Sequence, residues 1–172
     1  MISEPNKELI ENCQKGDMES FKLIYRHYEK TIYGYCFRML NNQQDSEDAM
    51  QTIFLNLYRG IGKYRFKARF STYLFTITRN VCIDLLKNQK GEKKNLDEVE
   101  NISVNPRSAE QDIANAISRL PQKTRECFIL FAMEGYPQGE IAELLNIKPG
   151  TVKAFIFQAR QKLIAWLGDE EG

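Results

Sequence analysis

Apolar residues recur at the spacing of an α-helix through most of the chain, and no alternation with a period of two persists long enough to predict a strand. The stretch between Pro5 and Pro106 contains no proline and carries three such apolar stripes, which indicate three long helices. The stripes consist of Phe21, Ile24, Tyr25, Tyr28, Ile32, Tyr35, Cys36 and Met39, then Ala49, Met50, Ile53, Phe54 and Leu57, and then Tyr73, Leu74, Ile77, Val81 and Leu85. A shorter helix is expected over residues 6–15, because Gly16 ends the pattern there. The predicted fold class is all-α.

Polar and charged residues dominate from about Asn88 to Ser108, where no helical period is maintained. This composition is typical of a flexible linker between domains. Helical spacing returns after it, and the pair Leu120-Pro121 starts a further helix. We therefore predict two small helical domains, residues 1–90 and 109–172, joined by a flexible linker at 91–108.

Two short helices joined by a tight turn are predicted near the C-terminus. Pro137 is placed at the first position of the first helix, where a fixed φ and a missing amide hydrogen are tolerated. The pattern breaks at Asn146, and Pro149 opens the second helix. The two apolar faces consist of Ile141, Ala142, Leu144 and Leu145 and of Val152, Ile156, Ala159 and Leu163. This arrangement is typical of the helix-turn-helix, whose second helix lies in the major groove of DNA; an ordinary helical hairpin is the alternative.

Charge is distributed unevenly, although the net charge is only +1. Residues 59–94 contain ten Lys or Arg and two Asp or Glu, whereas residues 1–58 and 95–172 are both net acidic. A single basic block in a nearly neutral chain favours a local contact with a polyanion. A solvated basic face without a partner is the alternative.

The centre of the basic block, Lys63 to Leu74, interleaves cations with aromatic residues. Lys and Arg neutralise phosphates, and aromatic rings stack on bases exposed from a duplex, so this segment is a candidate nucleic-acid site. In the alternative interpretation, the cations form a solvated face over a core of Phe66, Phe70 and Leu74. The polar face of the following helix adds Arg79, Asn80, Asp84 and Lys87.

The segment from Asp45 to Gln51, with the sequence Asp-Ser-Glu-Asp-Ala-Met-Gln, is predicted to begin a helix. We place Asp45 at the N-cap with Asp48 three residues later, because carboxylates in the first turn complement the helix dipole. An acidic and amide-bearing surface for a basic protein partner is the second interpretation. The segment supports both.

Residues that carry catalysis or bind cofactors do not form a recognisable set. Cys13, Cys36, Cys82 and Cys127 are scattered, and His27 is the single histidine, which argues against zinc and against a disulfide framework. No nucleophile–base pair or glycine-rich phosphate loop occurs, so we expect a binding protein with reduced core thiols, no catalytic residue, no metal and no cofactor. The N-terminus lacks a signal peptide and no apolar run reaches the length of a membrane span, which predicts a cytoplasmic protein without membrane insertion.

Together these segments resemble the extracytoplasmic-function (ECF, group 4) sigma factors, the smallest group of the sigma-70 family of bacterial RNA polymerase subunits. Residues 21–40, 45–55 and 70–80, with Asp84, are similar to region 2 of that family. The similarity to region 4 rests on Leu120, Pro121, Arg125, Glu140, Ile141, Ala142, Gly150, Thr151, Val152, Lys153, Ala159 and Arg160. A helix-turn-helix is shared with other regulators, whereas the ordered combination of all these segments is specific.

The resemblance implies a sigma factor, which binds core RNA polymerase and directs transcription initiation at promoter DNA, with an anti-sigma factor as a further partner. In this family, the helix at 45–57 docks on the clamp coiled coil of the β′ subunit. The implied polymerase-binding residues are Asp45, Glu47, Asp48 and Gln51. The segment 63–87 melts and reads the −10 element and holds a flipped base. The residues implied there are Lys63, Tyr64, Arg65, Lys67, Arg69, Ser71, Thr72, Tyr73, Arg79, Asn80 and Lys87.

Region 4 of the family binds the β flap and reads the −35 element. The residues implied here are Thr151, Lys153, Ala154, Phe155, Gln158, Arg160 and Lys162. The chain departs from the family at Ala154, Phe155 and Gln158, where a serine and two arginines are usual. Ala154 or Phe155 is a candidate contact to thymine methyl groups, and burial of Phe155 is the alternative. We therefore expect −35 recognition to depend on backbone contacts and DNA shape.

Two other functions fit parts of the chain. A stand-alone helix-turn-helix regulator would bind DNA without polymerase, and a protein-interaction module would mainly bind an anti-sigma factor. Binding to core polymerase distinguishes the sigma factor from both.

Overall fold

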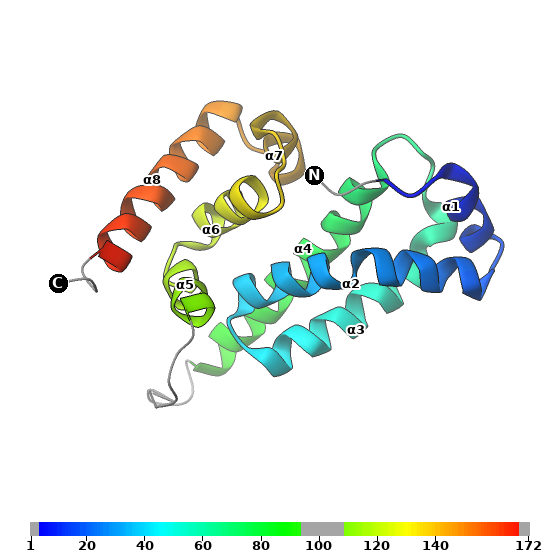
Figure 1. Cartoon of the computed structure of the whole chain (residues 1–172), viewed down its shortest axis with the longest axis horizontal. Coiled ribbons are helices and arrows are strands. Elements are labelled where there is room, and N and C mark those ends of the chain that lie inside the picture. The colour runs from blue at the N-terminus through cyan, green and yellow to red at the C-terminus, as the bar shows by residue number, and fades with distance from the viewer. Residues whose placement is uncertain (1–3, 94–108, 169–172) are drawn as a thin grey trace.

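In the computed structural model, which describes residues 4–93 and 109–168, these residues form helices and no strand (Figure 1). The first domain contains α1 (Lys7–Gln14), α2 (Met18–Leu40), α3 (Gln43–Gly60), the 3₁₀ turn η1 (Ile61–Lys63) and α4 (Phe70–Lys93). The second contains α5 (Ala109–Ser118), α6 (Gln122–Phe128), the π-helical η2 (Ile129–Met133), α7 (Gln138–Leu145) and α8 (Pro149–Gly168). The all-α class is confirmed. Helix α4 continues to Lys93, and the rest of the linker expected at 91–108 lies outside the described residues.

Short polar side chains fix where the first helices begin. Asn6, Asp17 and Asn42 precede α1, α2 and α3 in extended backbone, and each accepts a hydrogen bond from an amide of the first turn. The N-cap of α3 is therefore Asn42, and the prediction of Asp45 as the cap was wrong by one turn. The Asp45 carboxylate instead accepts a hydrogen bond of 2.7 Å from the Gln89 amide, which ties the start of α3 to the far end of α4.

The core of the first domain lies among α2, α3 and α4, with α1 packed against α2 and η1 (Figure 1). Its largest fully buried side chains include Tyr28, Tyr35, Met39, Ile53, Leu57, Phe70 and Leu74. The Gln14 amide of α1 donates 2.9 Å hydrogen bonds to the carbonyls of Ile61 and Tyr64. These bonds anchor the start of the loop between η1 and α4, which carries the basic and aromatic residues.

The predicted helix-turn-helix is present as α7 and α8. Pro149 begins α8 as expected, whereas Pro137 is the N-cap of α7 and not its first helical residue. Asn146 ends α7 in the left-handed conformation (φ +51°), and the Ile147 amide donates to the Ala142 carbonyl at 2.9 Å. This C-cap sets the tight turn that directs α8 away from α7.

We expect Asn146→Ala to lower the free energy of unfolding by about 1 kcal/mol, because only glycine and asparagine adopt this φ at little cost. Asn146→Gly should leave the stability nearly unchanged. Thermal unfolding followed by circular dichroism measures both. Equal losses for alanine and glycine would show that the asparagine side chain matters and not its backbone conformation.

The two domains share one continuous apolar cluster. The Phe75 ring on α4 contacts Tyr35 of the first domain and Tyr136 of the second, with centroids 5.5 and 5.3 Å apart. The stripe predicted for α4 is therefore only partly the core face: Leu74 is buried, but Tyr73 and three further members are only half-buried. Helix α4 lies between its own domain and the second one, so it is covered on two sides.

Candidate nucleic-acid and polymerase interfaces

The start of α3 presents an acidic, amide-bearing surface to solvent. Glu47, Asp48 and Gln51 are exposed, whereas Asp45 is half-buried and bonded to Gln89. Two of these carboxylates accept hydrogen bonds from glutamines one helical turn earlier. Gln43 donates to Glu47 at 2.9 Å, and Gln44 donates to Asp48 at 3.2 Å. Leu55 and Tyr58, further along the helix, are also exposed, at 46% and 44%. The surface therefore combines negative charge with apolar area, which suits a basic protein partner.

The loop between η1 and α4 separates its cations from its aromatic residues. Lys63, Arg65 and Lys67 are exposed, and the Arg65 guanidinium donates to the Gly62 carbonyl at 2.8 Å. Tyr64 is buried, and its hydroxyl donates to the Ala68 carbonyl at 2.6 Å. Tyr64 is thus part of the scaffold of the loop. The alternative core of Phe66, Phe70 and Leu74 is confirmed at Phe70 and Leu74, which are buried, and is wrong at Phe66, which is 38% exposed.

The residues expected to contact the −10 element divide between two faces of α4 and its preceding loop. On one face of α4, Asn80 and Lys87 are exposed and Thr72 is half-exposed. The Tyr73 ring packs against the Tyr64 ring, with their centroids 5.1 Å apart. Ser71, by contrast, is buried. Arg69 and Arg79 are partly covered and form ion pairs with other parts of the chain.

Three carboxylates of the second domain pair with arginines of the first. The Glu126 carboxylate is fully buried and accepts a 2.9 Å hydrogen bond from Arg79. The Arg69 guanidinium lies 3.5 Å from Glu140 and 3.3 Å from Glu4. A DNA phosphate that binds Arg69 or Arg79 would have to take the place of these carboxylates.

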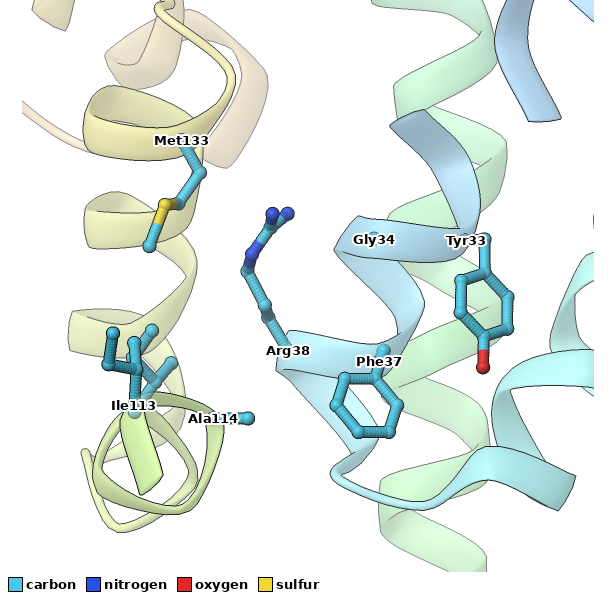
Figure 2. A pocket seen from close by; sticks show the side chains of 8 residues that line it. Tyr33, Gly34, Phe37, Arg38, Ile113, Ala114 and Met133 are labelled. Atoms are coloured by element: carbon cyan, nitrogen blue, oxygen red, sulfur yellow. The ribbon is translucent and has the colours of Figure 1, made fainter. Parts of the chain in front are cut away.

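The third pair lies beside an apolar cavity of about 340 Å³ between α2 and α5. Figure 2 shows Arg38 extending from α2 toward the second domain, where Ile113 and Met133 line the opposite wall. Its guanidinium lies 3.3 Å from the Glu134 carboxylate. Burial raises the pKa of Glu134 to about 7, and the Arg38 charge opposes that rise. An alanine at Gly34 would place its Cβ 3.0 Å from the Arg38 guanidinium, so this glycine leaves room for the arginine.

Hydrogen bonds that involve no carboxylate complete the interface between the domains. The Arg125 guanidinium donates across the interface to the Met39 carbonyl at 2.5 Å, and it is held in place by a second bond, to the Ser118 carbonyl of its own domain. Asn41, which ends α2 in the left-handed conformation, donates through its amide to Asn115 at 2.9 Å. The C-terminal end of α2 is therefore held to the second domain by both arginine and asparagine contacts.

The expected −35 residues lie along α8, mostly on its solvent face. Lys153, Ala154, Gln158, Arg160 and Lys162 are exposed, and Thr151 is half-buried. Phe155 is also half-buried and packs against the core, whereas Phe157, which was not among the expected −35 residues, is 63% exposed. The helical period places Phe157 three residues after Ala154 on the same face, and that spacing was the signal that could have identified it.

The four cysteine thiols are shielded from reaction by burial. Cys13, Cys36, Cys82 and Cys127 are buried and free of disulfides, and burial raises the pKa of Cys13 to about 11 and of Cys127 to about 12. Within residues 4–93 and 109–168, no group of three His, Cys, Asp or Glu side chains is placed to hold a metal ion. No helix in that part of the chain is both long and apolar enough to span a membrane.

Comparison with known families gives two matches in the expected order. The model of Sigma-70 region 2 matches residues 24–92, and the model of Sigma-70, region 4 matches residues 110–163. The ECF RNA polymerase sigma factor SigW of Bacillus subtilis is 32% identical, over 95% of this chain and 97% of its own. SigM of Mycobacterium tuberculosis (strain Erdman), also an ECF RNA polymerase sigma factor, is 30% identical over 95% of this chain and 85% of its own.

Solved structures share the fold. The sigma factor RpoE of Bartonella quintana, in complex with the anti-sigma factor NepR, superposes with a TM-score of 0.77 at 20% identity, covering 88% of this chain and 98% of that one. CnrH, in complex with the cytosolic domain of CnrY, gives 0.73 at 22% identity, with coverages of 94% and 96%. A stand-alone helix-turn-helix regulator would match at region 4 only, and here both regions match. The chain belongs to the ECF sigma factors, the subunits that bind core RNA polymerase and direct promoter-specific initiation of transcription.

Proposed function

We propose that the acidic start of α3 docks on the clamp coiled coil of the polymerase β′ subunit. The proposal is supported by the exposure of Glu47, Asp48 and Gln51 on one end of the helix, next to the exposed apolar side chain of Leu55. Asp45 has a different role in this proposal. Its hydrogen bond to Gln89 holds the docking surface at a fixed angle to α4.

The −10 element is assigned to the loop and to the exposed face of α4. Lys63, Arg65 and Lys67 are positioned to neutralise phosphates, since each is exposed. Asn80 and Thr72 present hydrogen-bonding groups along the helix, with Lys87 further on. Arg69, Ser71 and Arg79 contribute to this site when the second domain moves away from them.

The −35 element is assigned to α8, with the β flap as a second partner of region 4. Lys153, Arg160 and Lys162 supply phosphate contacts, Thr151 lies at the start of the helix, and Ala154 and Gln158 face solvent. Phe155 is assigned to packing and Phe157 replaces it as the apolar contact to thymine methyl groups. Arg160, the one arginine among these residues, is assigned to a phosphate, so backbone contacts and DNA shape carry most of the recognition.

One observation carries the assignment of this chain to promoter recognition. The loop between η1 and α4 exposes its cations, and it belongs to a chain that matches both sigma regions. We propose further that the protein acts in the cytoplasm, has no enzymatic activity of its own and is held inactive by an anti-sigma factor. The similar structure of RpoE from Bartonella quintana holds that sigma factor in complex with the anti-sigma factor NepR, which supports the last point.

The docking proposal predicts that Asp48→Lys with Gln51→Ala lowers the affinity for core RNA polymerase at least tenfold, or about 1.4 kcal/mol. Both side chains are exposed, so the fold should be retained. The control is Glu19→Lys, which makes the same change of charge at an exposed position of α2 outside the proposed docking surface. Fluorescence anisotropy of the labelled chain titrated with core enzyme measures the affinities. Equal affinities for the double variant and the control would place the docking surface elsewhere.

A further inference from the structure

Phe66, at the tip of the loop between η1 and α4, has an unusual backbone. Its φ is +57°, in the left-handed region that bulky side chains rarely adopt and that glycine adopts freely. Its ring is 38% exposed, so the strain does not serve to bury an apolar side chain. A strained conformation of this kind persists only where its surroundings impose it, and such residues cluster at functional sites.

The loop around Phe66 is braced by bonds that do not involve its side chain. The Tyr64 hydroxyl donates to the Ala68 carbonyl, and the Arg65 guanidinium donates to the Gly62 carbonyl. The Tyr64 ring also contacts Phe70 at 5.5 Å, which fixes the base of the loop to the core. Phe66 is consequently the aromatic side chain of this loop that is presented to solvent on a fixed support, with its centroid 4.8 Å from Tyr64.

One cation lies over the exposed ring and two others are its neighbours in sequence. Arg65 and Lys67 flank it in sequence and are exposed, and the Lys7 ammonium lies 5.5 Å from the ring centroid. Lys7 is 71% exposed and also lies 3.5 Å from Glu11, so it is held only by contacts at the surface. Stacking of a nucleobase on an aromatic ring contributes more than an exposed cation–π contact. A base can therefore displace Lys7, which is then free to meet the adjoining phosphate.

We propose that Phe66 is the stacking platform for one unstacked base of the non-template strand. The proposal rests on the assignment of the loop to the −10 element and adds a residue to it. Tyr64, which the resemblance implies among the −10 residues, is bonded into the scaffold, so Phe66 is the aromatic residue assigned to stacking. Because stacking is tolerant of base identity, Phe66 contributes affinity for the unpaired strand, and neighbouring polar groups select the sequence.

The test measures the affinity of holoenzyme, assembled from this chain and purified core RNA polymerase, for fork-junction DNA with a single-stranded −10 segment. The promoter sequence is taken from a random library selected with the unsubstituted holoenzyme. Each base of the segment is removed in turn to give an abasic site. The variants are Phe66→Gly, which relieves the backbone strain, Phe66→Leu, which keeps an apolar side chain, and Phe66→Tyr, which keeps a ring.

We expect one abasic position at which the unsubstituted holoenzyme loses about tenfold in affinity. Phe66→Gly and Phe66→Leu should lose about as much on intact DNA and show no further loss at that position, whereas Phe66→Tyr should behave as the parent does. Thermal unfolding of the free chain should show that Phe66→Gly is at least as stable as the parent. A lower stability would mean that the ring serves the fold, and would overturn the proposal.

The outcomes separate this inference from the assignment on which it rests. If the parent has a sensitive position and the glycine variant loses equally there, another residue stacks the base and the Phe66 proposal is wrong. If no position is sensitive in the parent, and alanine at Lys63, Arg65 and Lys67 leaves the affinity unchanged, the −10 assignment itself is wrong.

Discussion

Replacement of Phe75 by alanine is expected to lower the free energy of unfolding by about 3–5 kcal/mol, because the lost ring leaves a cavity that its neighbours fill only in part. Phe75 is fully buried and contacts Tyr35 and Tyr136, which belong to different domains. Its removal therefore weakens both the first domain and its contact with the second. Denaturant unfolding followed by circular dichroism measures the change.

A control and a milder variant keep this prediction testable if the alanine variant is too unstable to purify. Phe157→Ala removes the same atoms from a ring that is 63% exposed and should change the stability by less than about 0.5 kcal/mol. Phe75→Leu retains most of the apolar volume and should cost about 1–2 kcal/mol. Similar losses at positions 75 and 157 would contradict the shared core.

Weakening the contact between the domains is expected to raise the affinity of the free chain for single-stranded DNA. Arg79 cannot bind a phosphate while Glu126 holds it at 2.9 Å, and Arg69 is paired with Glu4 and Glu140. We call the arrangement with the two domains in contact closed, and one with the domains apart open. If about nine molecules in ten are closed, only about one in ten can bind DNA through Arg69 and Arg79. Complete opening then raises the apparent affinity for DNA about tenfold, since this affinity is proportional to the fraction of molecules able to bind.

The opening variant is Arg38→Gln with Asn41→Gly. It removes the pair with Glu134 and the hydrogen bond to Asn115, and glycine preserves the left-handed end of α2. The variant loses one positive charge, which by itself weakens DNA binding. Lys30→Gln makes the same charge change at an exposed position of α2 and should only lower the affinity. Opposite changes in the two variants, measured with fluorescein-labelled oligothymidine, support opening, and parallel decreases contradict it.

The buried Glu134 makes the same contact depend on pH. Its pKa is raised from 4.5 to about 7 in the closed arrangement, so the closed form binds this proton more tightly than an open form in which the carboxyl is exposed. The association of the domains is therefore strongest below about pH 4.5 and weakens as the pH rises through about 7. Small-angle X-ray scattering should show a larger radius of gyration at about pH 8 than at about pH 6, with a smaller difference in Glu134→Gln. An unchanged pH dependence in the glutamine variant would assign it to another group.

Much of the local structure was predictable because it depends on residues close together in the sequence. Helical spacing identified the principal helices, and Pro149 and the break at Asn146 located the helix-turn-helix. The cap of α3 was misplaced because Asn42 and Asp45 are both good caps, and the pattern does not show where the backbone leaves the extended region.

The sequence by itself determined the helical class, the order of the two domains and the chemical types of residue available to each interface. Tertiary structure decided which of those residues are accessible. Tyr64 and Phe66 are two positions apart and both aromatic, yet one is bonded into the loop and the other faces solvent. Arg79 is paired with a carboxylate 47 positions away. The accessibility of a side chain depends on which segments distant in sequence cover it. Here it depends on how α4 packs between the two domains, and the helical spacing of residues along α4 does not show this.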